Sequence, residues 1–276
     1  MRFDLNNCTI RLARPSDTAD LEAIARTIWD GTDYLPRIMD RWISEPWFFV
    51  CVYEGKVIAC IKLSLFPDNV LWIEGLRVHR RFQGKGIATL LNRHIFRFAT
   101  ELKARNPELA FEFCTYYKNA ESLHMTEKMG FRIVKRFYQL DKRGVKHTKE
   151  SEIVTDYDMS LFKAYPDYLP LGWQAVHNTA SSLDFIKSRA TVFRTPRSTY
   201  LLAGVGEKNI TFLQPPVQDL KVELPYFQSF FGSRRKYGIV LPPGFNEYLP
   251  QLLKLGFYFW EEEHEIAKCM VIGRKD

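Results

Sequence analysis

The sequence lacks the features that mark metalloproteins, disulfide scaffolds and membrane proteins. Its five cysteines are an odd number without paired spacing, no Cys-x-x-Cys or Cys/His cluster occurs, and its six histidines are scattered. We therefore expect small buried thiols in a reducing compartment and no metal site. No apolar run approaches the ~20 residues that a membrane-spanning helix needs. The first residues contain no apolar core like that of a signal peptide, so the expected location is cytoplasmic.

Acidic residues are fewer than basic ones, but the basic residues do not form a pattern that is typical of nucleic-acid-binding proteins. The chain has 39 Lys and Arg against 32 Asp and Glu, a net charge of +7, yet the basic residues are spread along it. Because no basic cluster lies on a nucleic-acid-binding module, we expect no nucleic-acid partner, and no membrane partner either. The 276 residues suffice for one large or two medium domains, and both a monomer and a homodimer remain open.

A glycine-rich junction is the most informative stretch that the sequence does contain. An apolar run ends at Val78, and Gln83-Gly84-Lys85-Gly86-Ile87-Ala88 then leads into a helix-like run. Glycines let a ligand approach the main chain, and the free N–H groups at a helix start favour an anion such as phosphate. The spacing fits neither a Walker A loop nor a dinucleotide fingerprint. The alternative is that these glycines serve only as a turn.

The hydrophobic patterning predicts an α+β fold in which helices cover a mixed sheet, in the order β-α-α-β-β-β-α-β-α-β. The predicted strands are Cys8–Arg14, Trp47–Tyr53, Val57–Phe66, Asn69–Val78, Leu109–Tyr116 and Phe131–Leu140. The predicted helices are a helix from the Ser16-Asp17 cap to about Thr27, Tyr34–Ser44, Gly86–Lys103 and Asn119–Met129.

The second half of the chain is predicted to be a separate α/β domain. A charge run within 141–157 marks a linker, which gives a first domain at 1–145, a linker at 146–157 and a C-terminal domain at 158–276. Residues 236–272 repeat a strand, a helix, a Gly-Phe pair and a strand, as around Gly130-Phe131. This echo predicts a degenerate half of the same fold that binds no second cofactor. The alternative is an unrelated αβ unit that ends in Gly-Phe.

Two motifs resemble the GCN5-related N-acetyltransferase (GNAT) superfamily. The glycine-rich junction matches its signature Arg/Gln-x-x-Gly-x-Gly/Ala, and Leu76-Arg77-Val78 is similar to the end of its fourth strand. Residues 119–131 are similar to the family's Asn-x-x-Ala-x-x-Leu-Tyr-Glu-Lys-Leu-Gly-Phe segment. The two motifs stand in the family's order, about 35 residues apart. The resemblance covers roughly residues 8–140.

The resemblance implies a GNAT fold and direct transfer of an acetyl group from acetyl-CoA to a primary amine of a small molecule or amino acid. Two alternatives are a protein or peptide N-terminal acetyltransferase and a non-catalytic acyl-CoA-binding module. The segment Trp29–Pro36, the residues Glu-Gly-Leu-Arg-Val at 74–78 and the long C-terminal half also resemble the vertebrate histidine N-acetyltransferases. That likeness points to a free amino acid or another small amine.

The resemblance also implies which residues contact the co-substrate. The backbone of Leu76, Arg77 and Val78 would pair with the pantetheine arm as an added strand. The diphosphate would lie against Gln83, Gly84, Lys85, Gly86, Ile87 and Ala88, with Thr89 near. Asn119 would be a further contact, and its alternative role is a helix N-cap.

Glu74 is the predicted general base, because a glutamate in an apolar strand is costly to bury unless it is paired or used. Strand alternation places it on one face with Trp72 and Leu76. The alternative is a salt bridge from Glu74 to Arg77 or Arg93. The resemblance implies a backbone N–H near Leu76 or Val78 as the oxyanion donor.

The general acid is less defined, because Thr126 occupies the position where many family members have a tyrosine. Thr126, Tyr116, Tyr117 or water could protonate the leaving thiolate. The acceptor is expected near a turn-rich segment, where Asp30 and Asp33 could attract a cationic amine between walls formed by Trp29 and Tyr34. The alternative is that both aspartates cap the second helix.

Overall fold

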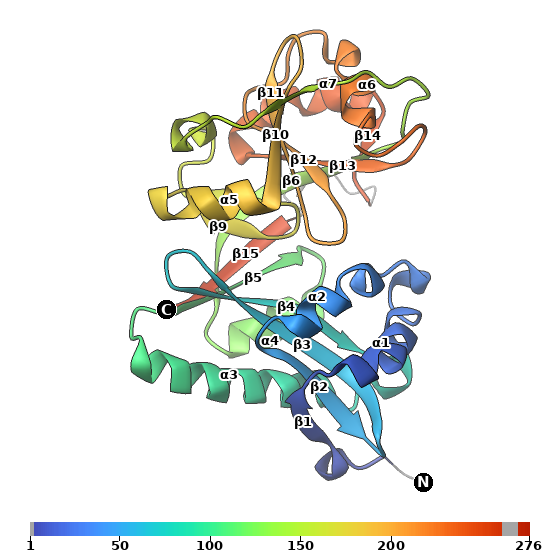
Figure 1. Cartoon of the computed structure of the whole chain (residues 1–276), viewed down its shortest axis with the longest axis vertical. Helices are drawn as coiled ribbons and strands as arrows, with labels where there is room; N and C mark the ends of the chain where they lie inside the picture. Colours follow the sequence, from blue (N-terminus) through green and yellow to red (C-terminus); the bar gives the residue numbers. More distant parts are fainter. Residues whose placement is uncertain (1–2, 261–269) are drawn as a thin grey trace. The chain divides into compact units, whose positions relative to one another are not determined.

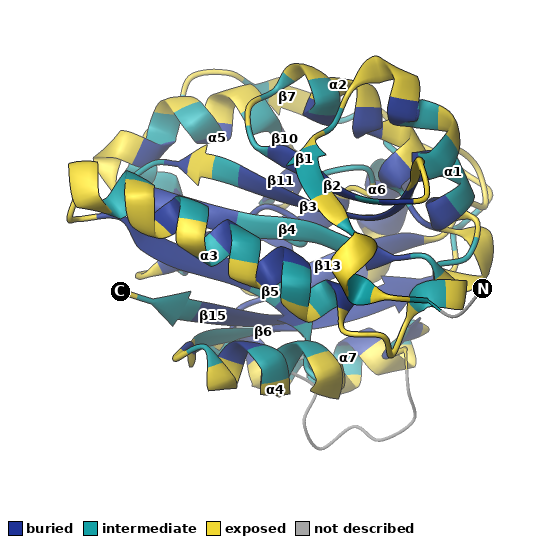
Figure 2. Cartoon of the chain, turned by 90° about the horizontal axis from the view of Figure 1, so that it is seen from below, coloured by how far each residue is buried: buried dark blue, intermediate teal, exposed yellow. Residues whose placement is uncertain are grey.

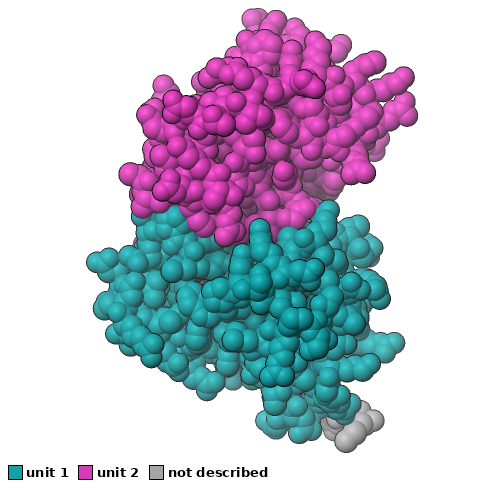
Figure 3. Space-filling model, viewed as in Figure 1, with its two compact units in different colours: residues 1–113, 274–276 teal, residues 114–273 magenta. Residues whose placement is uncertain are grey.

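The structure, a computed structural model, describes residues 3–260 and 270–276, which divide into two units (Figure 3). Unit 1 comprises residues up to Phe113 together with Arg274–Asp276, and unit 2 comprises Cys114–Gly273. The division falls inside two strands, so it differs from the sequence-derived limits at 145 and 158. Those domain limits stay a prediction.

The elements of residues 9–142 follow the predicted α+β order (Figure 1). They are β1 Thr9–Leu12, α1 Thr18–Ala25, α2 Met39–Ser44, β2 Phe48–Tyr53, β3 Lys56–Phe66, β4 Val70–Val78, α3 Ile87–Arg105, β5 Ala110–Tyr116, α4 Ala120–Lys128 and β6 Arg132–Lys142. The predicted helix Tyr34–Ser44 is shorter than expected. A 3₁₀ turn at Leu35–Arg37 precedes α2, because Ile38 leaves the helical region with φ −130°.

The sheet of unit 1 has the strand order β1-β2-β3-β4-β5. The first three pairings are antiparallel, and β4 pairs with β5 in parallel across the α3 crossover. One side of α3 is buried and the other exposed (Figure 2), and its Leu91 and Ile95 are completely buried in a cluster with β2 and β3. The ladder between β4 and β5 joins Val70–Ile73 to Ala110–Phe113. From Glu74 onward, β4 therefore runs beyond this ladder.

A β-bulge interrupts β4 beyond the ladder with β5. Glu74 pairs with Lys62 but Arg77 pairs with Cys60, so β4 contains one more residue than β3 over this interval. Gly75 lies in the bulge with φ +71°, and a Cβ atom there would be 2.6 Å from the ring of Trp42. The bulge therefore depends on a residue without a side chain.

The bulge also changes which residues share a face of the sheet. Leu76 packs with Ile73 in the cluster under α3, whereas Arg77 is brought to the face of Glu74. The prediction from strict alternation, that Leu76 and Glu74 share a face, is wrong for this reason. The two charged residues Glu74 and Arg77 thus lie on the face of the sheet that Trp42 of α2 covers.

Unit 2 contains more regular structure than the sequence predicted. Its further elements are β7 Glu152–Val154, β8 Tyr168–Pro170, β9 Ala175–His177, α5 Leu183–Arg189, β10 Ala190–Arg194, β11 Thr199–Ala203, β12 Asn209–Phe212, α6 Leu224–Gln228, β13 Tyr237–Leu241, α7 Leu249–Lys254, β14 Phe257–Tyr258 and β15 Met270–Lys275. Strand β7 lies inside the predicted linker. The predicted last strand falls partly on 261–269, outside the described residues.

The topology of unit 2 repeats that of unit 1. The order β7-β10-β11-β12-β13 has three antiparallel pairings and then a parallel one, with α6 in the crossover where unit 1 has α3. Helices α4 and α7 are each followed by a left-handed glycine, Gly130 at φ +86° and Gly256 at φ +80°. The repeat supports the predicted degenerate second half of the fold.

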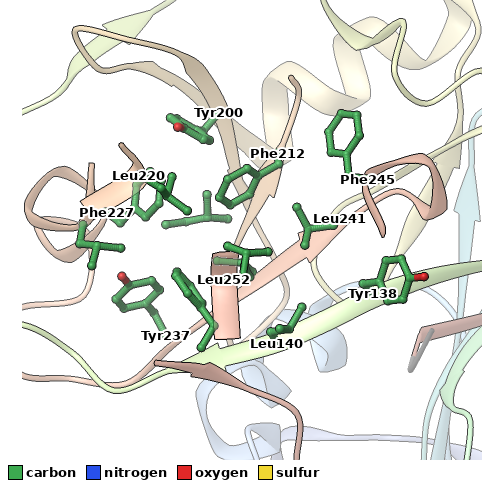
Figure 4. Packing of buried hydrophobic residues seen from close by; sticks show 14 of the residues in the cluster. Tyr138, Leu140, Tyr200, Phe212, Leu220, Phe227, Tyr237, Leu241, Phe245 and Leu252 are labelled. Carbon is green, nitrogen blue, oxygen red and sulfur yellow. The ribbon is translucent and has the colours of Figure 1, made fainter. Parts of the chain in front are cut away.

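The core of unit 2 is rich in aromatic side chains (Figure 4). Tyr200, Phe212 and Phe227 contact one another edge to face, with ring centroids 4.7–5.8 Å apart. Such contacts stabilise beyond the burial of area alone. The high aromatic content of the sequence is therefore used largely in packing.

The bulge provides a test of the fold. We expect Gly75→Ala to lower the free energy of unfolding by about 2–4 kcal/mol, because overpacking against Trp42 adds to the strain at positive φ. Gly55→Ala is the matched control, since Gly55 has φ +78° and open space around it. It should cost only about 1 kcal/mol. Equal losses for both variants in chemical denaturation would contradict the assigned contact.

Candidate active site

The predicted site residues lie in both units. Unit 1 contains the acceptor segment, Glu74, the end of β4 and the glycine-rich junction, whereas unit 2 contains Tyr117, Asn119 and Thr126. The described residues contain no group of three or more His, Cys, Asp and Glu side chains that could hold a metal ion. Every described helix is too short or too polar to cross a bilayer.

The glycine-rich junction forms an open turn at the start of α3. Gly84 has φ +71° and Gly86, the N-cap of α3, has φ +81°. The backbone ladder of the helix begins where the Leu90 N–H donates to the Gly86 carbonyl at 2.9 Å. The N–H groups of Ile87, Ala88 and Thr89 come before that bond, so they lack intrahelical acceptors. The helix dipole adds positive potential at this end.

No bulky group fills the space beside the two glycines. A Cβ atom on Gly84 would meet no described atom within 4 Å, and one on Gly86 would meet only the Leu5 side chain, at 3.5 Å. Gln83 and Lys85 are exposed, and the Gln83 amide ties the turn to β4 by donating to the Val78 carbonyl at 3.0 Å. The turn is therefore both accessible and fixed, as an anion site requires.

Cations surround the junction. Arg80, Arg81 and Lys85 are exposed, and the Lys85 ammonium lies 5.1 Å from the centroid of the Phe82 ring. His79 caps the 3₁₀ turn Arg80–Phe82, because its Nδ1 accepts the Arg81 N–H at 3.2 Å. Burial lowers the pKa of the His79 imidazole, and the charge of Arg81 lowers it further. The neutral ring is therefore the form that caps this turn.

Glu74 lies beside the bulge with a defined partner. Its Oε1 accepts a hydrogen bond of 2.7 Å from the Ser64 hydroxyl on β3, and the residue is only partly buried. One oxygen is thus oriented by the sheet. The bulge that follows places Gly75 and Leu76 opposite the single residue Ile61, so one residue of β4 has no ladder partner.

Arg77 has a role that the sequence reasoning missed. Its guanidinium donates two bonds to Asp33, from Nε at 2.6 Å and from Nη2 at 2.8 Å, and both side chains are buried. Burial opposes its charge, but Tyr34 and Asp33 raise the pKa of Arg77 above its ordinary value. The Tyr34 ring centroid lies 4.6 Å from the guanidinium carbon.

The contacts of Arg77 determine which of the predicted acceptor residues are exposed. Both Asp33 oxygens are bonded to Arg77, and Oδ1 also accepts the Leu35 N–H at 3.2 Å, so Asp33 caps the turn before α2. Asp30 and Trp29 are exposed, and the Trp29 and Tyr34 ring centroids are 6.2 Å apart. The structure thus brings these residues together but leaves Asp30 as the exposed carboxylate.

The predicted site residues of unit 2 lie on α4 and just before it: Thr126 is in the helix, Asn119 is its N-cap and Tyr117 precedes the cap. The Asn119 side chain accepts the Ser122 N–H at 3.2 Å, which is the N-cap role, and its amide donates to Thr115. The Thr126 hydroxyl donates to the Ser122 carbonyl at 2.8 Å within the same helix. Its proton is thus committed to the backbone, whereas Tyr117 is partly exposed beside Tyr116.

A signal for the missed role of Arg77 is present in the sequence. A glycine inside an apolar strand commonly marks a bulge, and Gly75 separates Glu74 from Leu76 and Arg77. A bulge moves every following side chain to the other face. Recognising it would have placed Arg77, rather than Leu76, beside Glu74.

The cap formed by His79 predicts a pH dependence. Because its pKa is lowered on folding, the unfolded chain binds the proton first, and the stability from the neutral ring is lost as the pH falls below about 6.5. We expect His79→Asn, which keeps an acceptor but does not titrate, to lose less stability than the wild type between about pH 7.5 and about pH 5.5. His94, whose pKa is also lowered, is the same in both proteins. Parallel stability curves would contradict this assignment.

Comparisons with known proteins identify a family to which part of this chain is similar. A sequence model of the acetyltransferase (GNAT) family matches residues 18–131. A histidine N-acetyltransferase of Oreochromis niloticus is 34% identical over 102 residues, which cover 36% of this chain and 29% of that protein. A probable N-acetyltransferase 16 of Homo sapiens is 28% identical over 138 residues, 49% of this chain and 34% of that protein. The chain thus aligns with about a third of the length of these curated relatives.

Solved structures extend the likeness to the whole chain at the level of the fold. A putative acetyltransferase from Thermoplasma acidophilum has a TM-score of 0.66 at 13% identity and covers 97% of this chain and 99% of its own. A GCN5-related N-acetyltransferase from Sphaerobacter thermophilus has a TM-score of 0.60 at 14% identity, with 98% and 96% covered. The chain has the GNAT fold, and its residues 18–131 are similar in sequence to the GNAT family.

Proposed function

We propose that this protein is an acetyl-CoA-dependent N-acetyltransferase that acts on a primary amine of a small molecule or amino acid. The observation that carries the proposal is the open turn at Gly84 and Gly86, whose free N–H groups start α3 close in sequence to the end of β4. Two main-chain features that an acyl-CoA needs, an anion site and a strand segment beyond its ladder with β5, lie on one continuous segment.

The segment fits the chemical groups of acetyl-CoA. The diphosphate would lie on the amides from Gln83 to Ala88, with Thr89 near and with Arg80, Arg81 and Lys85 as counter-charges. The pantetheine amides would pair with Leu76–Val78, the part of β4 that runs beyond the ladder with β5. When bound, acetyl-CoA supplies an activated acyl group as a thioester.

Glu74 is the proposed general base. An amine must lose a proton as its nitrogen bonds to the acetyl carbonyl carbon, and the Glu74 carboxylate, which Ser64 orients, can accept that proton. The main-chain N–H groups of the bulge at Gly75 and Leu76 are the proposed donors to the oxyanion that forms. The thiolate that leaves takes a proton from Tyr117, Tyr116 or water, since the Thr126 proton is held by its own helix.

The acceptor class rests on two observations. The relative from Oreochromis niloticus is named for histidine, and its likeness to this chain supports a small amine with a free α-amino group. The exposed Trp29 ring and the exposed Asp30 carboxylate offer a planar surface and a negative charge to such a cation. A screen of amino acids, polyamines and short peptides with acetyl-CoA, followed by thiol release, tests this class. Transfer to peptides alone would overturn it.

The co-substrate site is tested by a single substitution. We expect Gly86→Glu to abolish acetyl-CoA binding in isothermal titration calorimetry, because the new carboxylate would occupy and repel the anion site. Gly55→Glu is the matched control, since Gly55 is an exposed glycine with a similar positive φ that is not among the proposed acetyl-CoA contacts. Failure of the wild type to bind acetyl-CoA, or undiminished binding by Gly86→Glu, would refute the proposal.

The base is tested by Glu74→Gln. The amide keeps the size of the side chain and its bond to Ser64 but cannot take a proton, so we expect kcat to fall about 100-fold or more. Acetyl-CoA binding should be retained. Glu54→Gln, which removes the same charge from an exposed turn, should leave kcat unchanged. A Glu74→Gln enzyme with full rate at every pH would exclude Glu74 as the base.

A further inference from the structure

The segment that follows α1 contains a strained bend. Trp29, Asp30 and Gly31 are consecutive residues with φ of +45°, +52° and +80°. Such values are uncommon for residues other than glycine, and strain of this kind persists only where the surroundings impose it. The side chain of Trp29 is 62% exposed, so burial of the bend itself does not impose this conformation.

The hydrogen bonds within the bend join only residues that are close in sequence. The Thr32 N–H and hydroxyl both donate to the Trp29 carbonyl, at 3.0 Å and 2.7 Å, and the Gly31 N–H donates to Ile28. These bonds close the turn but do not connect it to the sheet. Just before the bend, the Thr27 hydroxyl accepts the Arg80 N–H at 3.2 Å, from the turn after β4. A direct connection to the sheet comes from the residues that follow the bend.

Asp33 and Arg77 provide that connection. Asp33 comes two residues after Gly31, and its carboxylate accepts two bonds from Arg77 on β4. The guanidinium also lies 5.6 Å from the Trp29 ring centroid and 4.6 Å from that of Tyr34. Arg77 thus lies near Trp29 within the bend and near Asp33 and Tyr34, which follow it. A bidentate fork of this kind fixes direction as well as distance.

The bulge determines what the bend is fixed to. Because β4 has one extra residue at Gly75, Arg77 shares a face with Glu74, the proposed base. A Cβ atom on Gly75 would lie 2.6 Å from the Trp42 ring and 3.4 Å from the Arg77 guanidinium. The arginine is therefore seated against the bulge by packing on one side and by Asp33 on the other.

We propose that Arg77 is a positioning residue for the acceptor amine, which acts by holding the bend Trp29–Gly31 through Asp33 beside Glu74. This inference rests on the proposed function. The pair removes Asp33 from the set of charges open to the amine and leaves Trp29 and Asp30 as the residues that meet it. The proposed acetyl-CoA contact of Arg77 is made by its main chain, and the diphosphate turn lies on Gln83–Thr89, so the Arg77 side chain is not part of the proposed acetyl-CoA site. We call the Asp33–Arg77 pair the clamp. The clamp should therefore govern the KM of the amine and not the affinity for acetyl-CoA.

The test uses Arg77→Lys in the full chain, with Arg11→Lys as the matched control. Lysine keeps the charge but loses the fork. Arg11 makes a similar two-bond pair with Asp17, at 2.7 Å and 2.8 Å, elsewhere in unit 1. We expect Arg77→Lys to raise the KM of the amine about tenfold, the value of one charge-assisted hydrogen bond, with an unchanged acetyl-CoA dissociation constant. Arg11→Lys should change neither quantity.

Hydrogen exchange separates this inference from the proposed function. Deuterium uptake in peptides covering residues 29–37 should increase in Arg77→Lys and not in Arg11→Lys, whether or not an amine substrate is known. Unchanged uptake there, or equal losses of amine and acetyl-CoA affinity, would overturn the clamp. If Arg77→Lys does not fold, Asp33→Asn carries the same measurements. A wild type that acetylates no amine would refute the proposed function, while the exchange result would still decide for or against the clamp.

Discussion

The packing of Trp42 against the bare Cα of Gly75 is the constraint on which the candidate site depends. An indole in that position leaves no room for a Cβ atom, and the positive φ of Gly75 lets β4 accommodate one extra residue. Everything that follows along β4 is displaced to the opposite face. Arg77 and the main chain of Leu76 reach their places relative to Glu74 because of that single inserted residue.

The bulge also joins two kinds of chemistry that would otherwise lie on different elements. Main-chain groups at the end of β4 lie beyond its ladder with β5, and the chain then passes through the turn at Gly84 and Gly86 into α3. Side-chain groups on the other face are Glu74, which Ser64 orients, and Arg77, which pairs with Asp33; we propose that they serve the acceptor. One strand thus presents its backbone to one proposed substrate and its side chains to the other.

The second half of the chain keeps the topology and loses the anion site. Between β12 and α6, where unit 1 has its glycine turn, the segment 213–223 contains two prolines and no glycine. Glu223 precedes α6 as a fully buried carboxylate that accepts bonds from Thr195 and Tyr200. A diphosphate at the start of α6 would meet the Glu223 carboxylate and a segment without a glycine turn. The start of α6 thus lacks the open glycine turn that is found at the start of α3.

Sequence patterns predicted the elements of residues 9–142 because their periods and glycine turns are local signals. The Gly84 and Gly86 turn and the Asn119 cap were found in the same way. The Asp33–Arg77 pair was not, because it joins residues 44 positions apart and depends on the register of β4. Strands β7–β12 were missed because they are short and their pairing in unit 2 is set by tertiary contacts.

The central claim, that one continuous stretch of main chain from the bulge to α3 holds acetyl-CoA, is tested most directly by amide chemical shifts. Titration of the ¹⁵N-labelled protein with coenzyme A should shift the resonances of Gly75, Leu76, Gly84 and Gly86 together, with a single dissociation constant. Shifts that fall on other residues while these four amides stay unchanged would contradict the account.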